Sequence, residues 1–204
     1  MSVTGAEGGR RRNRPESPKT TLSVIAIFGA LIALLTSVFS IPLPPPVYEI
    51  TLAPAVYLAL AAMVEPYTSG AAIGLGSFIG EAYNIATKPN GSPIYPFGML
   101  WARVPEAFIV WWARDKGRGV LIMAMIAATM FETLAFFLSD WAFYYYGVFN
   151  YSQIGGFGPG DVVSSFTAAA PDILTAVDIL FIPVALAIIR EAKPAFARLG
   201  FTQA

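Results

Sequence analysis

The chain has 204 residues, of which 56% are hydrophobic and only 13% are charged. Soluble globular proteins carry roughly 25% charged residues, so this composition excludes an ordinary water-soluble domain. The 13 Lys and Arg residues balance the 13 Asp and Glu residues, and the chain contains neither Cys nor His. Disulfide, thiolate and imidazole chemistry are therefore excluded, and we expect neither a metal site nor a cofactor.

The first 20 residues are polar and rich in Gly, Pro and Arg. This composition, with five basic side chains, predicts a disordered basic tail over residues 1–20. The apolar segment Leu22–Ile41 follows and is long enough to cross about 30 Å of hydrocarbon. Its length favours a membrane span over the shorter apolar core of a signal peptide.

Five further apolar segments are separated by Pro, Gly and charged residues, which punctuate secondary structure. They are Ile50–Val64, Tyr67–Thr87, Pro96–Ala113, Val120–Tyr146 and Ala170–Ile189. We therefore predict an all-α integral membrane protein with six transmembrane helices. The membrane domain would cover residues 21–191, and residues 192–204 would form a short C-terminal tail.

The positions of Lys and Arg predict the orientation, because cytoplasmic loops carry an excess of these residues. If the N-terminal tail is cytoplasmic, every Lys and Arg except Lys88 and Arg103 falls on its side of the membrane. The opposite orientation reverses this distribution. We predict a multi-pass protein of the plasma membrane with both termini in the cytoplasm.

The predicted outer connections are longer than the inner ones. The longest, Gly147 to Ala169, contains a run of Gly and Pro residues. Long connections within a compact domain tend to be functional, so this one is a candidate lid over an outward-facing site.

Seven charged residues lie inside the predicted spans: Glu81, Arg103, Glu106, Glu132, Asp140, Asp172 and Asp178. A charge at the bilayer centre costs at least about 2.5 kcal/mol, so we expect these side chains to face one another or a polar cavity. Counting helix rise from the predicted span ends brings five polar residues to similar outer levels. This outward-facing pocket would contain Glu81, Asn84, Arg103, Asp140 and Asp172, with Glu106 about 5 Å deeper than Arg103. The same count places Glu132 and Asp178 nearer the middle or the inner half.

Two interpretations of these charges stay open. Arg103 could form a structural ion pair with Glu106, three residues away, or with Glu81. The acidic residues outnumber this cation six to one, however, so pairing cannot account for most of them. The remainder would be protonated or would bind a cationic or donor-rich ligand.

Aromatic residues accompany the acidic ones at the predicted outer level. Tyr and Trp gather at membrane interfaces in any case. A flat cationic ring could also stack on such side chains beside a carboxylate. Trp101, Trp141 and Tyr144 are therefore further candidates for ligand binding.

Small residues recur along the first span, where Ala26, Ala30 and Ala33 accompany Gly29. A stripe of small residues lets another helix approach closely. The third span carries glycines at similar spacing. Both stripes indicate helix packing.

The stretch YEITLAPAVYLALAAMVEPYTSGAAIGLGSFIGEAYN resembles the substrate-binding S components of energy-coupling factor (ECF) transporters. The resemblance consists of an apolar helix, a short Pro turn, a Gly-rich helix and an acidic residue near its outer end. The family often has Gly-Pro at the turn, where this chain has Glu65-Pro66. The stretches GEAYNIATKPNGSPIYPFG and ARVPEAFIVWWARDKG are similar to members that carry thiamine or its pyrimidine precursor.

The resemblance implies a membrane-embedded S subunit of an ABC importer that captures a small vitamin-like solute at its outer face. The solute would be cationic or nitrogen-rich, with thiamine or its precursor as the best candidate, and Glu81 and Glu106 would be the acidic positions. Ala26 and Ala30 resemble the Ala-x-x-x-Ala pattern that docks S components on a transmembrane coupling protein, and the ATPase subunits would be further partners. The chain has no P-loop of its own and no nucleic-acid partner is expected.

Two other functions remain possible from the residues. A stand-alone permease could use Glu132 and Asp178 as proton carriers, and a structural subunit could pair its acidic residues with cations of a partner. Enzymatic activity is not expected, because without His and Cys only carboxylates remain for acid–base chemistry.

Overall fold

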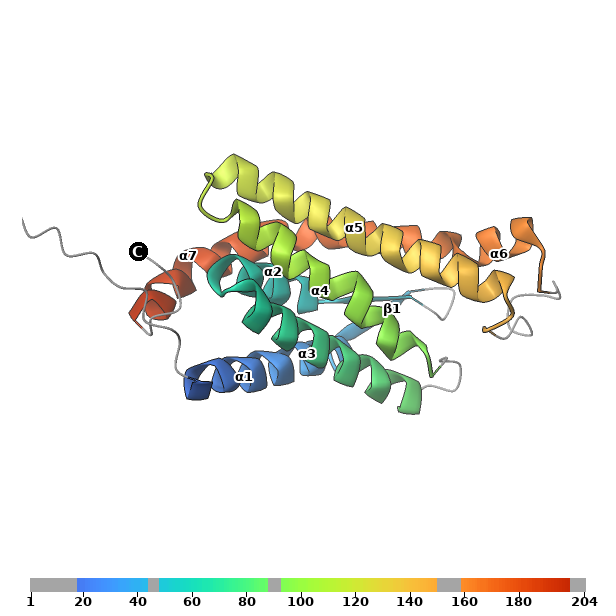
Figure 1. Ribbon diagram of the computed structural model, residues 1–204, viewed down its shortest axis with the longest axis horizontal. Helices are drawn as coiled ribbons and strands as arrows, with labels where there is room; N and C mark the ends of the chain where they lie inside the picture. The colour runs from blue at the N-terminus through green and yellow to red at the C-terminus, as the bar shows by residue number, and fades with distance from the viewer. Residues whose placement is uncertain (1–17, 44–47, 88–92, 150–158, 199–204) are drawn as a thin grey trace, which may run out of the picture.

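The computed structural model describes residues 18–43, 48–87, 93–149 and 159–198. In this part of the chain, six helical segments run back and forth along the long axis of the molecule (Figure 1). They are α1 (Pro18–Ser37), α2 (Ala53–Met63), α3 (Pro66–Thr87), α4 (Tyr95–Ala113), α5 (Arg118–Tyr145) and a composite sixth segment. The sixth consists of α6 (Val162–Ala169), the 3₁₀ helix η2 (Ala170–Phe181) and α7 (Ile182–Arg198). The prediction of six helices is confirmed.

A β-hairpin that the sequence analysis missed connects the first two helices. Strand β1 (Ser40–Leu43) pairs antiparallel with β2 (Tyr48–Thr51), and Ile41 lies opposite Ile50. The predicted span 22–41 was therefore wrong at its C-terminal end, and the predicted span 50–64 was wrong at its N-terminal end. Pro42 in β1 cannot continue a helix, and Pro54 marks the first turn of α2. The 11 residues of α2 cover only about 16 Å, roughly half of a bilayer core.

Helix α2 lies at the centre of the bundle. Of its 11 residues, all except Val56 are buried, and Tyr57, Leu58 and Leu60 have no exposed surface. A helix that is apolar on every side is stable only when other elements surround it. Here α4 and α7 pack most extensively against α2, and α1, α3 and η2 also contact it.

The sixth segment begins earlier and ends later than the predicted span 170–189. Asp161 caps α6 by accepting hydrogen bonds from the Val163 amide at 3.0 Å and from the Ser164 hydroxyl. These bonds favour the ionised carboxylate and lower the pKa of Asp161. Residues 162–169, predicted as part of the outer loop, therefore form a helix.

Parts of the remaining predicted loop and tails lie outside the described residues. These parts are 1–17, 88–92, 150–158 and 199–204. Within the described part, helix α1 already includes residues 18–20 of the predicted tail, and α7 continues to Arg198.

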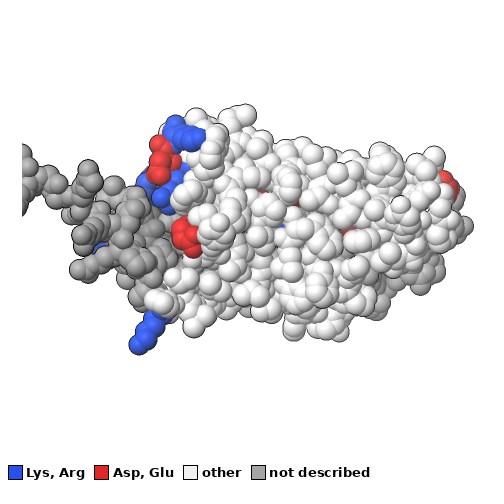
Figure 2. Space-filling view, viewed as in Figure 1, with Lys and Arg blue, Asp and Glu red and all other residues white. Residues whose placement is uncertain are grey.

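Three of the helical stretches are long and apolar enough to cross a membrane: 18–37, 118–145 and 162–198. Helices α3 and α4, with 22 and 19 residues, are long enough to cross a membrane but are not among these three apolar stretches. Lys and Arg gather at the end of the molecule that contains the α4–α5 turn and the last turns of α7 (Figure 2). The opposite end, where α6 and its N-cap residue Asp161 lie (Figure 1), shows no such basic group among the described residues on the face drawn in Figure 2.

Helices α1 and α3 approach each other closely along glycines, as the small-residue stripes predicted. A Cβ atom on Gly76 would lie 2.5 Å from the Gly29 carbonyl oxygen and 2.8 Å from the Ile32 Cβ atom. A Cβ atom on Gly80 would lie 2.7 Å from the Thr36 Cβ atom. The backbone itself forms the contact, so no larger residue fits without separating the helices.

We expect Gly76→Ala to destabilise the protein by about 1–3 kcal/mol, because the added methyl group collides with the backbone of α1. The matched control is Gly119→Ala in α5, where a Cβ atom would have nothing within 4 Å. The control should be neutral or stabilising by up to about 1 kcal/mol, since Ala favours a helix over Gly. Thermal unfolding of the full-length protein in detergent measures both, and equal effects would contradict the close approach.

Candidate functional site

A buried ion pair between Arg103 of α4 and Glu132 of α5 lies in the interior of the bundle. The Arg103 Nε atom donates a 2.6 Å hydrogen bond to Glu132 Oε1, and the two side chains are 9% and 0% exposed. A second Arg103 nitrogen donates to the Ser77 hydroxyl at 3.2 Å. Pairing with Glu81 or Glu106, which the sequence suggested, was therefore wrong. Helix contacts across the bundle, and not spacing along α4, select the partner of Arg103.

Tyr57 of α2 and Asp178 of η2 complete this arrangement. The Tyr57 hydroxyl donates to Glu132 Oε2 at 2.9 Å and lies 3.4 Å from Asp178 Oδ2. The Arg103 guanidinium carbon lies 5.4 Å from the centroid of the Tyr57 ring, within the range of a cation–π contact. We call these residues the central network: Tyr57, Ser77, Arg103, Glu132 and Asp178.

The central network brings together side chains that the sequence analysis, by counting helix rise from the span ends, had placed at different depths in the membrane. Glu132 and Asp178 were expected deeper than Arg103, but Glu132 contacts it directly, and Tyr57 links Glu132 to Asp178. The count assumed that every helix starts at the same membrane level. Helix α5 has 28 residues and exceeds the bilayer core, so its ends do not mark the membrane boundaries.

A second acidic group, which we call the outer pair, consists of Asp140 of α5 and Asp172 of η2. The two residues are 6% and 4% exposed, and their carboxyl groups contact each other. The prediction that they lie at the same level agrees with this placement. Between the outer pair and the central network, the Thr175 hydroxyl donates to Thr133 Oγ1 at 2.9 Å.

The 3₁₀ geometry of η2 aligns these groups. A 3₁₀ helix has three residues per turn, so Asp172, Thr175 and Asp178 lie in one row. The row rises about 12 Å at 2.0 Å per residue. On α5, the eight steps from Glu132 to Asp140 also rise about 12 Å at 1.5 Å per residue. The matching rises allow polar side chains to meet repeatedly along the α5–η2 contact.

Glu81 and Asn84 form a third polar group near the end of α3. The Asn84 side-chain nitrogen lies 3.2 Å from Glu81 Oε2 and 3.3 Å from the Thr36 carbonyl oxygen. Asn84 is buried, and Glu81 is half-buried and close enough to Arg103 to interact with it electrostatically. The five residues predicted for one pocket therefore fall into three neighbouring groups.

The three predicted aromatic residues differ in their surroundings. Trp101 is 40% exposed and meets Phe143 edge-on at 6.1 Å. It points away from Arg103, because two residues on a helix are separated by about 200°. Trp141 packs against Phe166 with ring centroids 5.7 Å apart. Tyr144 contacts the buried Phe149 at 5.0 Å, at the end of α5 near the outer pair.

Sequence reasoning missed Tyr57, Ser77, Thr133 and Thr175. Tyr57 carried a usable signal, since a hydroxyl in the middle of an otherwise apolar helix needs a hydrogen-bond partner. Ser and Thr carry no such signal, because either can bond to the carbonyl one turn before it.

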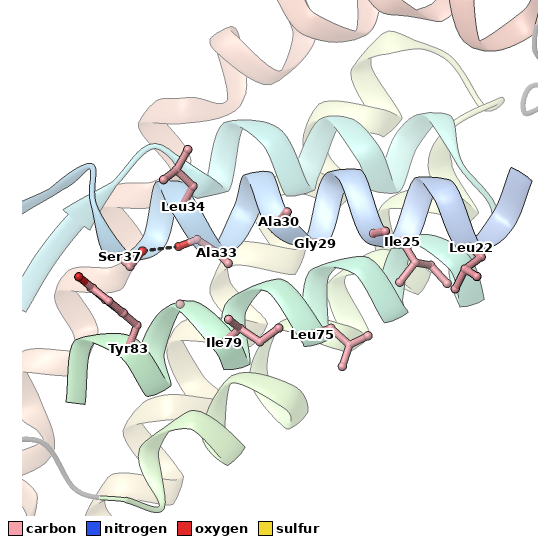
Figure 3. Close-up of a pocket in the computed structure, with 12 residues that line it drawn as sticks. Leu22, Ile25, Gly29, Ala30, Ala33, Leu34, Ser37, Leu75, Ile79 and Tyr83 are labelled. Carbon is pink, nitrogen blue, oxygen red and sulfur yellow. Dashed lines mark hydrogen bonds between the residues drawn. The ribbon is translucent and has the colours of Figure 1, made fainter. Parts of the chain in front are cut away.

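The predicted docking residues line an open apolar groove between α1 and α3 (Figure 3). The groove has a volume of about 620 Å³ and is lined by Ala26, Gly29, Ala30 and Ala33 of α1 and by Leu75, Ile79 and Tyr83 of α3, among others. Ala26 and Ala30 are exposed, and Leu75, Ile79 and Tyr83 are 51%, 56% and 55% exposed.

Comparison with known proteins identifies the fold. No family model and no curated protein matches the sequence. A solved structure described as the S component of a bacterial ECF transporter matches with a TM-score of 0.61 and 17% sequence identity. The match covers 88% of this chain and 99% of that chain. The chain therefore has the fold of an ECF transporter S component, as its sequence resemblance predicted.

We expect Glu132→Gln to destabilise the protein by about 3–5 kcal/mol, because it leaves the buried Arg103 without its counter-charge. The matched control, Glu191→Gln, disrupts an exposed pair with Arg190 and should change stability by less than about 1 kcal/mol. Thermal unfolding of the purified protein measures both variants. Equal stability of the two would contradict a structural role for the central ion pair.

Proposed function

We propose that this chain is the substrate-binding S subunit of an ECF-type ABC importer. The observation that carries the proposal is the fold, whose likeness to an S component extends over 88% of this chain. In this role the protein captures a small solute and is not an enzyme. A transmembrane coupling protein and ATPase subunits supply the energy for transport.

We propose that the protein lies in the plasma membrane with both of its termini in the cytoplasm. The grouping of Lys and Arg at one end of the molecule supports it through the positive-inside rule. The outer pair then lies toward the external side, because α5 ends and η2 begins away from the basic end (Figure 1).

The solute site that we propose lies at this external side. It comprises the outer pair together with Glu81, Asn84 and Tyr144, and the central network forms its floor through Arg103. The carboxyl groups of Asp140, Asp172 and Glu81 have few hydrogen-bond donors around them among the described residues. They therefore favour a ligand that is rich in N–H groups or carries a positive charge. Thiamine or its pyrimidine precursor satisfies this requirement, and Trp141 and Tyr144 supply aromatic surfaces near the outer pair.

We expect the purified protein to bind thiamine or its pyrimidine precursor saturably in calorimetry. Asp172→Asn and Glu81→Gln should weaken binding about tenfold or more, since each removes a charge that faces the ligand. Glu191→Gln at the exposed end of the chain is the control and should bind as the wild type does.

Absence of saturable binding of any thiamine-like solute would contradict the proposed substrate. Equal affinity of the Asp172 and Glu81 variants and the wild type would contradict the proposed site. Ion-dependent uptake into liposomes that contain this protein alone would contradict the S-subunit role and support a permease.

The groove between α1 and α3 is the surface that we propose for the coupling protein. Its alanines leave room for a second helix to approach α1 closely, and the flanking Leu75 and Ile79 supply apolar contact area. The occupant that fits is an apolar helix of the membrane partner.

The double substitution Ala26→Leu with Ala30→Leu should abolish co-purification with the coupling protein, because the larger side chains fill the groove. The matched control is Ala127→Leu with Ala142→Leu, which alters two exposed alanines of α5. Pull-down of the co-expressed complex measures both. Survival of the complex in the α1 variant would show that α1 is not the interface.

A further inference from the structure

The turn between α4 and α5 carries more positive charge than its own acidic group neutralises. It contains one acid, Asp115, and three cations, Arg114, Lys116 and Arg118. The Arg114 Nε atom donates to Asp115 Oδ2 at 2.9 Å. Lys116 and Arg118 are exposed, and neither forms an ion pair with an acidic side chain of the described residues. Two cations of this turn therefore lack a counter-charge within the described part of the chain.

The adjoining helix ends do not supply the missing charge. Arg118 is the first residue of α5, and the first turn of this helix contains no acidic side chain. At the α2–α3 turn, which lies at the same end of the molecule, Glu65 is engaged in capping α3. Its carboxylate accepts hydrogen bonds from the Tyr67 and Thr68 amides at 3.2 and 2.8 Å. The charge of Lys116 and Arg118 is therefore available to an anion from outside the chain.

An aromatic face of α4 leads to this turn. Trp101, Phe108 and Trp112 follow one another at spacings of seven and four residues, so they lie on one side of the helix. All three are exposed, and Tyr67 of α3 meets Phe108 edge-on at 5.4 Å. We call these four residues the aromatic ridge. The eleven steps from Trp101 to Trp112 rise about 16 Å, roughly half of a 30 Å bilayer core, so the ridge is as long as one leaflet is thick.

Lys116 connects the aromatic ridge to the charged turn. Its Nζ atom lies 3.0 Å from the centroid of the Trp112 ring. This contact holds the ammonium group in place, and the exposed side chain keeps its charge accessible. An apolar surface as long as one leaflet thus ends at a positioned cation, with Arg118 two residues further along the chain. The two parts match the acyl chains and the phosphate of a phospholipid.

We propose that the aromatic ridge and the α4–α5 turn bind one anionic phospholipid from the leaflet on the basic side of the molecule. The acyl chains lie along the ridge, and Lys116 and Arg118 contact the headgroup. Cations close to the membrane surface favour an anionic headgroup over a zwitterionic one. A lipid fits better than an acidic segment of a protein, because an acidic segment would leave the exposed aromatic side chains beside the turn unused.

The basic residues of α7 provide a comparison in which positive charge occurs without such a ridge. Lys193 and Arg198 are exposed near the end of α7, at the same end of the molecule. The aromatic side chain between them, Phe196, packs against Phe28 of α1 with ring centroids 5.7 Å apart. These two cations therefore attract anions without offering an aromatic surface to acyl chains.

The proposal goes beyond the solute-binding role and does not depend on it. The aromatic ridge and the α4–α5 turn contain none of the residues that we propose for the solute or for the coupling protein. Lipid binding is measured on the purified protein without solute or partner subunits. Failure of the calorimetric or pull-down experiments would leave it unaffected.

Native mass spectrometry of the full-length protein in detergent tests the site with phosphatidylglycerol and phosphatidylcholine of identical acyl chains. The wild type should bind one phosphatidylglycerol about tenfold more tightly than phosphatidylcholine. Lys116→Gln with Arg118→Gln should remove this preference, because both charges that contact the headgroup are lost. The charge-matched control, Lys193→Gln with Arg198→Gln, should bind phosphatidylglycerol as the wild type does.

Trp112→Ala tests the aromatic ridge separately. It should weaken binding of phosphatidylglycerol about threefold or more, because contact with the acyl chains and the support of Lys116 are both lost. The matched control is Phe131→Ala, which removes an exposed aromatic ring from α5 and should bind as the wild type does. All these substitutions change exposed side chains, so thermal unfolding without added lipid should give the wild-type midpoint.

Equal affinity of the wild type for the two lipids would overturn the proposal. An equal loss of phosphatidylglycerol binding in the α4–α5 turn variant and its α7 control would also overturn it, since charge without a defined site would then explain the binding. If the turn variant binds phosphatidylglycerol normally but no longer co-purifies with the partner subunits, the turn is a protein interface and the lipid site is wrong.

Discussion

The ion pair between Arg103 and Glu132 is the interaction on which the interior of the bundle depends. It joins α4 to α5, and its neighbours Ser77 and Tyr57 attach α3 and α2 to the same point. A guanidinium in an apolar environment must be paired and hydrogen-bonded. Four helices are therefore held in a fixed register by the requirements of one cation.

The two sides of the bundle are assembled by different physical means. Helices α1 and α3 meet through glycine backbones such as Gly76, where van der Waals contact is the main attraction. Helices α5 and η2 meet instead through polar pairs, including Asp140 with Asp172. The contact between α1 and α3 leaves an apolar groove on the lateral surface of the bundle. The second contact encloses acidic groups that suit a polar ligand, whereas the groove between α1 and α3 is apolar and suits a membrane partner.

The long 3₁₀ segment η2 makes the polar side possible. Runs of 3₁₀ helix longer than three or four residues are uncommon, and this one has 12. In an α-helix, Asp172 and Asp178 would be rotated by about 240° from each other and could not both face α5. With three residues per turn they lie in one row. The geometry of η2 therefore determines which acidic residues come together, and local sequence patterns do not predict it.

The sequence by itself determined the membrane class, the number of helices and the identity of most buried charges, because hydropathy and helix length are local properties. It also predicted that Asp140 and Asp172 lie at the same level and that the small residues of α1 allow close helix packing. Only the tertiary structure decided that Arg103 pairs with Glu132, that Tyr57 completes the network, and that a hairpin precedes α2. These features depend on the register between helices that are distant in the chain. That register results from the buried ion pair of Arg103 together with the packing between helices, which no spacing within a single helix reveals.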